Sequence, residues 1–508
     1  MTAFDLGLEG LIEGAIILAL PLRVGRTLLT RGLHRKLVVF PRLAVAIAAA
    51  AAAFIIVIGF GALWASTWRA LAAMSLAALA AEAWRRRPAF GSARRLPPGS
   101  LALAPLGPWV DPEFHDIQAR RYGPVFKMTH LLSPQVCIAD LELARDFLRR
   151  HDAALVVPPL PFNRFVPGGF IRYLDPGAHR VRIATLRAAV AREVVDAAEP
   201  AVRGFVRDAL AGLARLDAST HPRACLDPMV FRSVAYLFFG FLPGTEHFAR
   251  LERAMAAIDY RRALWTPAFR VRRALADTSA LLRDAPPGGF ARSLAAADPV
   301  AARDPAVIAN MAYMFNTAWS DVAGLMSWMA WWLAANPLWL ARVRGAPDAA
   351  SLAERIVRET LRLSQSEYIM RRAREPLEVA GFVIPAGWLV RVCIREIHRL
   401  ADVFPDPRRF DPDRFLDPPG SSQYAPFGAS RISCLGESTT LLVGRLLALE
   451  LARGYDVAVA RDGPAELGPF HWQPSGRFRM RLTPRDQLAV GQRAPATPSA
   501  RTAAVRRR

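Results

Sequence analysis

Cys434 lies in a loop whose residue types suit a metal-binding thiolate. The loop spans residues 427–436 and directly precedes an apolar stretch, residues 436–453, that is typical of a helix. A cysteine at a helix N-terminus receives backbone N–H groups and the positive end of the helix dipole, and both stabilise a thiolate. Phe427 could pack on a flat macrocycle, and Gly436 would let the backbone approach it closely. A buried, unreactive thiol is the ordinary alternative for a single cysteine.

A second constellation precedes this loop by about 70 residues. Glu359 and Arg362 are three residues apart, so on a helix their side chains share one face. A buried pair on that spacing can orient a second arginine, and Arg414, in the segment 402–419 that is dense in proline and aspartate, is placed to be that arginine. An ordinary surface salt bridge is the alternative for any single Glu-x-x-Arg. The order of the segments that follow favours the buried pair.

The elements that must position these residues are mostly helical, with short β segments, between residues 100 and 485. Residues 305–336 are apolar with a proline at either end, which predicts one long buried helix. Residues 351–363 predict a charged amphipathic helix. Residues 376–395 look extended, with a turn inside them.

Composition narrows the possible classes of protein. The chain has 508 residues, of which 53% are hydrophobic, and its net charge of +22 comes mostly from arginine. The sequence shows neither zinc-finger spacing nor a single basic reading helix, so we expect no nucleic-acid partner. The arginines cluster beside apolar stretches, which favours a membrane surface. The four widely spaced cysteines indicate free thiols and a reducing compartment.

The N-terminal part predicts a membrane anchor. Residues 44–65 carry no charge and are long enough to span a bilayer, and a shorter apolar stretch follows at 70–83. Positive residues flank both sides, which favours a helical hairpin with both ends in the cytoplasm. One tilted span with an interfacial helix is the alternative, and residues 8–22 predict a further interfacial helix. The Leu-Pro-Pro-Gly segment at 96–99 ends the anchor.

Taken together, the motifs resemble the cytochrome P450 family. The resemblance spans about residues 96–484 and is specific from 354 to 454. It rests on the Glu-x-x-Arg helix, the turn Ile384-Pro385-Ala386-Gly387, the Phe404–Phe415 segment and the Phe-to-Cys-x-Gly loop. The resemblance implies a mainly α fold with a small β portion, preceded by a transmembrane anchor.

The same resemblance implies a cofactor and assigns residues to it. The chain is expected to bind haem b (iron protoporphyrin IX) between the long helix and the helix after Cys434. Cys434 would be the axial ligand of the iron, with Phe427 and Gly436 against the haem. Arg371 would hold a haem propionate. The remaining family residues would form a structural set: Glu359, Arg362 and Arg414.

The loop and one helix depart from the family pattern. The family normally has Gly four residues before the cysteine and Arg or His two before it, where this chain has Ser430 and Ile432, with Arg431 one place earlier. Arg431 could reach a propionate from that position, or the loop could be remodelled. The segment Asp175-Pro176-x-x-His179 resembles the helix that supplies His and Arg to the other propionate. His179 is one candidate there, and Arg182 stands one place short of the family's arginine.

The long helix carries a departure with consequences for chemistry. Where the family has an acid followed by Thr, this chain has Ser320 followed by Asp321. In the family that pair relays protons to oxygen bound at the iron. Three readings remain open: the swapped pair still delivers protons through water, the enzyme uses peroxide or rearranges its substrate, or Asp321 merely hydrogen-bonds within the helix or contacts a polar group of the substrate.

The resulting hypothesis is a cytochrome P450-type monooxygenase that oxidises a hydrophobic small molecule. Its electrons would come from a separate ferredoxin, flavodoxin or reductase. We expect residues 1–95 to contact membrane lipid, residues 96–484 to form a cytoplasmic catalytic domain at a bacterial inner membrane, and residues 485–508 to be a disordered basic tail. Peroxygenase or isomerase activity, or a haem-binding sensor or scaffold without catalysis, is the alternative.

Overall fold

The structure is a computed structural model that describes residues 95–485, apart from 102–106, 131–132, 159–168, 217–219, 257–267, 285–287, 366–367, 418–422 and 469–470. The expected anchor and the basic tail lie outside the described residues. Within them, no helix is both long enough and apolar enough to cross a membrane.

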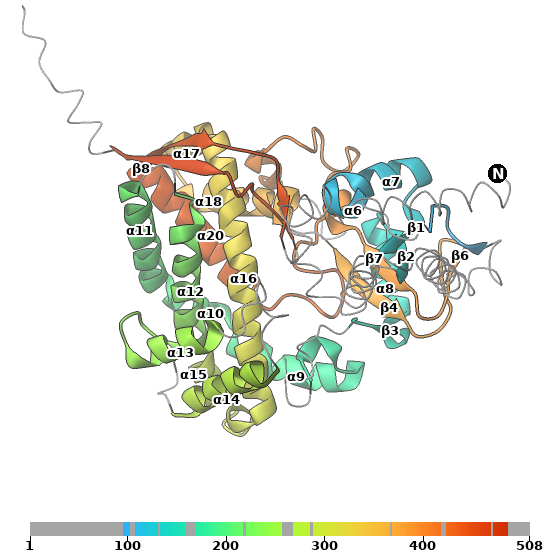
Figure 1. Ribbon diagram of the computed structural model, residues 1–508, viewed down its shortest axis with the longest axis horizontal. Coiled ribbons are helices and arrows are strands. Elements are labelled where there is room, and N and C mark those ends of the chain that lie inside the picture. Colours follow the sequence, from blue (N-terminus) through green and yellow to red (C-terminus); the bar gives the residue numbers. More distant parts are fainter. Residues whose placement is uncertain are drawn as a thin grey trace, which may run out of the picture.

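The chain folds into a large helical part beside a smaller part that contains the main sheet (Figure 1). The helices are α6 Gly107–Val110, α7 Phe114–Tyr122, α8 Leu141–Arg150, α9 Pro176–Ala189, α10 Arg192–Ala197, α11 Glu199–Arg215, α12 Arg223–Phe239, α13 Glu246–Ala256, α14 Ala268–Asp284, α15 Gly289–Ala297, α16 Pro305–Ala335, α17 Leu338–Gly345, α18 Ala349–Thr360, α19 Ile394–Ile397 and α20 Glu437–Gly454. A π-helical turn, Leu361–Gln365, continues α18.

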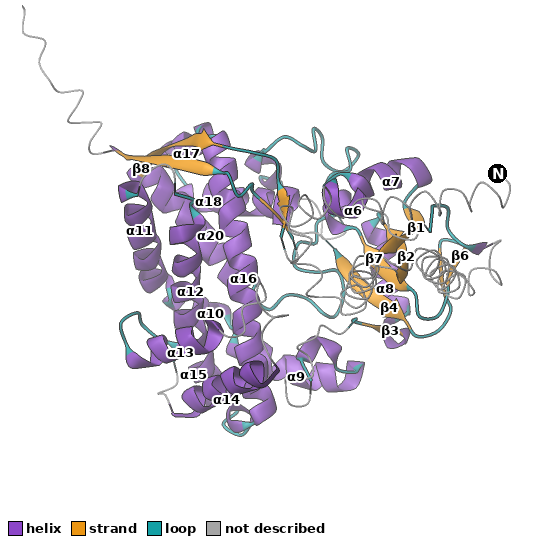
Figure 2. Cartoon of the chain, viewed as in Figure 1, coloured by secondary structure: helices purple, strands orange, loops and turns teal. Residues whose placement is uncertain are grey.

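The strands form one five-stranded sheet and three short two-stranded ribbons, coloured orange in Figure 2. The sheet has the order β1-β2-β7-β4-β3. The strands are β1 Val125–His130, β2 Ser133–Ile138, β3 Leu155–Val156, β4 Ile369–Ala373, β5 Leu377–Val379, β6 Phe382–Ile384, β7 Leu389–Val392, β8 Tyr455–Arg461, β9 Glu466–Leu467, β10 Trp472–Gln473 and β11 Arg479–Pro484. The prediction of a mainly α fold with a small β portion is therefore confirmed.

The long helix α16 has well-defined ends. Asp304 accepts a hydrogen bond from the Ala306 N–H at 2.8 Å and Pro305 occupies the first turn, where its missing N–H costs nothing. Pro337 follows the last turn and prevents the helix from continuing. The apolar side chains between these ends are largely buried, and α16 crosses the whole helical part beside α12 (Figure 1).

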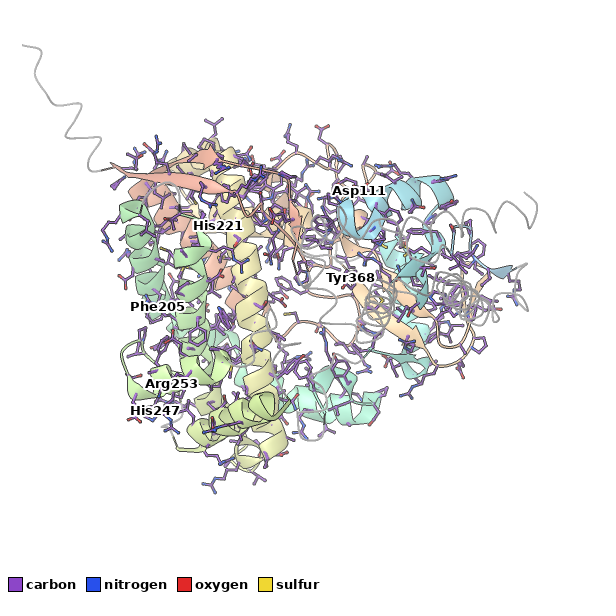
Figure 3. The ribbon with its side chains drawn as sticks, viewed as in Figure 1. Asp111, Phe205, His221, His247, Arg253 and Tyr368 are labelled. Carbon is purple, nitrogen blue, oxygen red and sulfur yellow. The ribbon has the colours of Figure 1, made fainter. Side chains whose placement is uncertain are left out.

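Two apolar cores hold these parts together. The larger core joins α11, α12, α16, α18 and α20, and the smaller one lies between the main sheet and α8. Tyr368 leads into β4, and Figure 3 places it between the helical part and the sheet. The guanidinium carbon of Arg391 lies over its ring, 4.0 Å from the ring centre. The two parts thus meet at the segment that carries Arg371.

Candidate active site

The loop around Cys434 is closed by its own backbone. The Cys434 N–H donates to the Phe427 carbonyl at 2.7 Å, and the Gly436 N–H donates to the Cys434 Sγ at 3.3 Å. Gly428 has a φ of +115°, where only glycine is at ease, and a Cβ there would lie 3.1 Å from the Ile432 carbonyl oxygen. Phe427 packs half-buried against the helical core. The loop therefore presents the thiol just before the first turn of α20.

The protein packed around the Cys434 sulfur raises the pKa of its thiol. Burial is the largest cause, the Gly436 N–H opposes it, and the charge of Asp321 adds to it. The expected stabilisation of the thiolate by the helix N-terminus is therefore outweighed in the protein alone. A bound metal cation reverses this balance, because a coordinating thiol is deprotonated outright. The site thus fits a cysteine that becomes a thiolate by ligating a metal.

Cationic side chains gather around Arg371, which donates to Ser430 of the Cys434 loop. Arg371, on β4, is buried, and burial lowers its pKa to about 10, helped by the charges of Arg172 and Arg431. Burial and the charge of Arg431 also lower the pKa of His179, whose Nδ1 is buried and finds no partner among the described residues. Asp152 is the acid beside them. Such a cluster suits a ligand that carries two carboxylates, and haem carries two in its propionates.

The two departures in the loop are linked to this cluster. Ser430, in the place of the family's Gly, accepts a hydrogen bond from Arg371 Nη2 at 3.1 Å. Arg431 Nε lies 2.8 and 2.6 Å from the two carboxylate oxygens of Asp152, which holds its guanidinium beside Arg371 and His179. The structure does not bring Arg182 to this group, because its Nη1 pairs with Asp304 at 3.1 Å.

The structure brings Glu359, Arg362 and Arg414 together. Both carboxylate oxygens of Glu359 accept from Arg362, at 2.7 and 2.8 Å, and both side chains are fully buried. Arg414 Nε lies 3.5 Å from Glu359. Arg362 also donates to the carbonyls of His398 and Pro407, at 2.7 and 2.8 Å. The set therefore fastens the coil at residues 407–414 to α18.

Ser320 and Asp321 are both exposed on α16. The charge of Asp321 raises the pKa of the Cys434 thiol, so its carboxylate lies within electrostatic reach of the sulfur. Gln365, on the π-turn, donates from Nε2 to the Asp321 carbonyl at 3.1 Å. Gly324 leaves room for this contact, because a Cβ there would lie 3.1 Å from that nitrogen.

Sequence reasoning missed four residues of this site. Asp152, Arg172 and Gln365 reach it from other segments, and His471 Nε2 lies 3.5 Å from the Asp321 carboxylate. For Asp152, the sequence offered one signal, because this acid closely follows Arg149 and Arg150 in a chain rich in arginine. For His471 no signal existed, because 150 residues separate it from Asp321.

Comparison with known proteins connects this geometry to a family. The family model for cytochrome P450 matches residues 350–448, which include Glu359, Arg362, Arg371, Arg414 and Cys434. Abscisic acid 8'-hydroxylase 3 of Oryza sativa is 27% identical, over 74% of this chain and 84% of its own length. Abscisic acid 8'-hydroxylase 1 of Arabidopsis thaliana is 30% identical over a shorter region, 34% of this chain and 41% of its own length.

Solved structures share the fold. The retinoic acid-bound cyanobacterial CYP120A1 aligns with a TM-score of 0.64 at 21% identity, over 77% of this chain and 99% of its own length. A zebrafish cytochrome P450 with abiraterone aligns with a TM-score of 0.60 at 18% identity, over 73% and 98% of the two chains. The family match, the relatives and the shared fold confirm the resemblance read from the sequence. The chain is therefore similar to cytochrome P450 monooxygenases, in sequence through the matched region and the relatives and in fold through the solved structures.

Proposed function

We propose that this protein hydroxylates a hydrophobic small molecule at a haem b held by Cys434. The observation that carries the proposal is the Cys434 loop, which presents a single thiol within electrostatic reach of Asp321 and contacts Arg371 through Ser430. When bound, the haem supplies oxygen activation, because a thiolate ligand pushes electron density toward O–O cleavage. Arg371, Arg431 and His179 would hold its propionates, and Phe427 and Gly436 would lie against the macrocycle.

Asp321 has the residue type and the position for a proton carrier. Its carboxylate is exposed and close enough to influence Cys434, and Gln365 fixes its backbone. The hydroxyl of Thr317, one helical turn earlier, already donates to the Met314 carbonyl at 2.9 Å. We assign to Asp321 the role of holding the proton that oxygen chemistry consumes.

The relatives suggest the first substrates to test. They are named for hydroxylation of abscisic acid, and a structural neighbour binds retinoic acid. Both ligands are apolar carboxylic acids. With a reductase or ferredoxin as electron donor, the wild-type enzyme is expected to convert one of these acids, or a related apolar acid, and to place one atom of ¹⁸O₂ in the product. Mass spectrometry of the product provides the measurement.

The same assay tests Asp321. Asp321→Asn is expected to lower product formation by about 100- to 10,000-fold with haem content unchanged, the usual share of general acid catalysis. Asp277→Asn, an exposed acid on α14, provides the matched control and should change nothing. Label from H₂¹⁸O₂ but not from ¹⁸O₂ would assign peroxide chemistry instead. Conversion without label would assign a rearrangement, and haem binding without any conversion would assign a sensor or scaffold.

We also propose that residues 1–95 anchor the enzyme to membrane lipid and that residues 96–484 form its catalytic domain. The uncharged run at 44–65 and the flanking arginines support this location. The relatives come from plants, so they give no support to a bacterial membrane. The full chain is expected to stay with membranes in alkaline carbonate and to be released by detergent. Release by carbonate alone would contradict the anchor.

A further inference from the structure

A short ribbon near the C-terminus brings a histidine to the long helix. Strands β9 and β10 pair with Trp472 opposite Leu467 and Gln473 opposite Glu466. The Gly468 N–H donates to the His471 carbonyl at 2.8 Å. A Cβ on Gly468 would lie only 2.7 Å from that oxygen, so the contact needs glycine. This hydrogen bond fixes the backbone of His471 at the end of the ribbon.

Tryptophans fasten the ribbon to α16. Trp328 Nε1 donates to the Trp472 carbonyl at 2.9 Å, and Trp328, Leu467 and Trp472 form a buried cluster of their own. Trp328 follows Asp321 by seven residues, which is about two helical turns, so both side chains lie on the same side of the helix. The ribbon therefore runs along the side of α16 that carries Asp321.

The result is a contact between His471 and Asp321 from segments 150 residues apart. His471 Nε2 lies 3.5 Å from Asp321 Oδ1. The imidazole is 30% exposed and the carboxylate 58% exposed. Solvent thus reaches both the imidazole and the carboxylate.

We propose that His471 supplies protons to Asp321, an inference that rests on the proposed role of Asp321. The imidazolium gives its Nε2 proton to Asp321 Oδ1, so that a neutral imidazole and a carboxylic acid result. The imidazole then accepts a proton from solvent, and Asp321 returns to the carboxylate when it releases its proton to the reaction. No electrons are exchanged in these steps. His471 acts through Asp321, as a positioning residue that also renews its proton.

The other charged and titratable groups around this pair have their own partners or lie beyond it. Glu466, on the same ribbon, accepts from the Gly476 N–H at 3.0 Å, and Asp462 accepts from Trp331 at 2.9 Å. From α16, the charge that faces His471 is Asp321 itself. The charges of Asp321, Arg172 and Glu437 act on the Cys434 thiol. Among these described groups, His471 is the base that contacts Asp321.

The test compares the holoenzyme with its His471→Gln and Asp321→Asn variants, using His247→Gln as the control. His247 stacks on Phe241 at 5.6 Å, low on α13 and away from α16 in Figure 3. His471→Gln is expected to lower product formation about 10-fold and to divert electrons to peroxide, at unchanged haem content and KM. Wild-type product formation should fall as the pH rises through the pKa of His471, because only the imidazolium can give the proton. That step should be missing in His471→Gln.

A second readout does not depend on turnover. In the resting enzyme, the NMR titration of His471 should shift to lower pH in Asp321→Asn, because a nearby carboxylate favours the imidazolium. If His471→Gln forms as much product per electron as the wild type and keeps its pH profile, while Asp321→Asn is inactive, the inference is overturned. The role of Asp321 then stays intact. An effect on KM alone would overturn it in favour of a substrate contact. Full activity of Asp321→Asn would overturn both proposals.

Discussion

Cys434→Ser is expected to abolish the long-wavelength carbon monoxide band of the reduced enzyme. A thiolate ligand pushes electron density onto the iron, and a serine oxygen in its place would not reproduce this effect. Product formation should fall by more than the roughly 10- to 100-fold that is lost when only the partner of a metal ligand is changed. The measurement is the carbon monoxide difference spectrum of detergent-solubilised protein, together with product formation.

Cys225→Ser provides the matched control. Cys225 is half-buried on α12, and its Sγ would lie 3.7 Å from a Cβ on Gly212, so it packs between two helices. Its replacement should leave the carbon monoxide band unchanged. A long-wavelength band that survives in Cys434→Ser would mean that another cysteine ligates the iron. A band at the ordinary haem position in fresh wild-type protein would remove the monooxygenase function altogether.

The sequence was sufficient to predict those features that are determined by residues close together in the chain. Asp304, Pro305 and Pro337 set the ends of α16, because capping and the missing proline N–H act locally. The Glu359–Arg362 pair follows from a spacing of three on a helix. The Cys434 loop combines a glycine at positive φ with a helix start, and both can be read from the residues themselves.

Long-range contacts and the balance of opposing effects could not be read in the same way. Arg431 binds Asp152 across 279 residues, and His471 meets Asp321 because tryptophans elsewhere hold its ribbon to α16. The helix N-terminus predicted a thiolate at Cys434, but the pKa depends on how much protein surrounds the sulfur, which only the fold determines. Arg182 stands one residue before the position of the family's arginine, and it pairs with Asp304 instead of joining the cation cluster.

Arg362→Met is expected to lower the free energy of unfolding by about 3–5 kcal/mol, the usual cost of breaking a buried ion pair. The substitution leaves Glu359 fully buried without its main partner, and burial already raises the pKa of this carboxyl. Urea unfolding followed by circular dichroism gives the free energy, and the Soret band reports haem in the same samples.

Arg358→Met is the control on the same helix. Arg358 pairs with Glu354 at 2.7 Å, but the two side chains are 28% and 31% exposed, so solvent screens the pair. Its loss should cost less than about 1 kcal/mol. Equal effects of the two substitutions would contradict the structural role assigned to the buried pair.

The cost of losing Arg362 should not be recovered by also neutralising Glu359. In Arg362→Met with Glu359→Gln the buried charge is gone, yet the carbonyls of His398 and Pro407 still lack their donor. His398 in turn accepts from the Ala425 N–H at 3.0 Å, two residues before the Cys434 loop begins. Because this chain of hydrogen bonds ends at the loop, haem should leave the double variant at lower urea than the helices unfold. Coincident transitions would mean that the pair supports the whole fold and has no particular link to the loop.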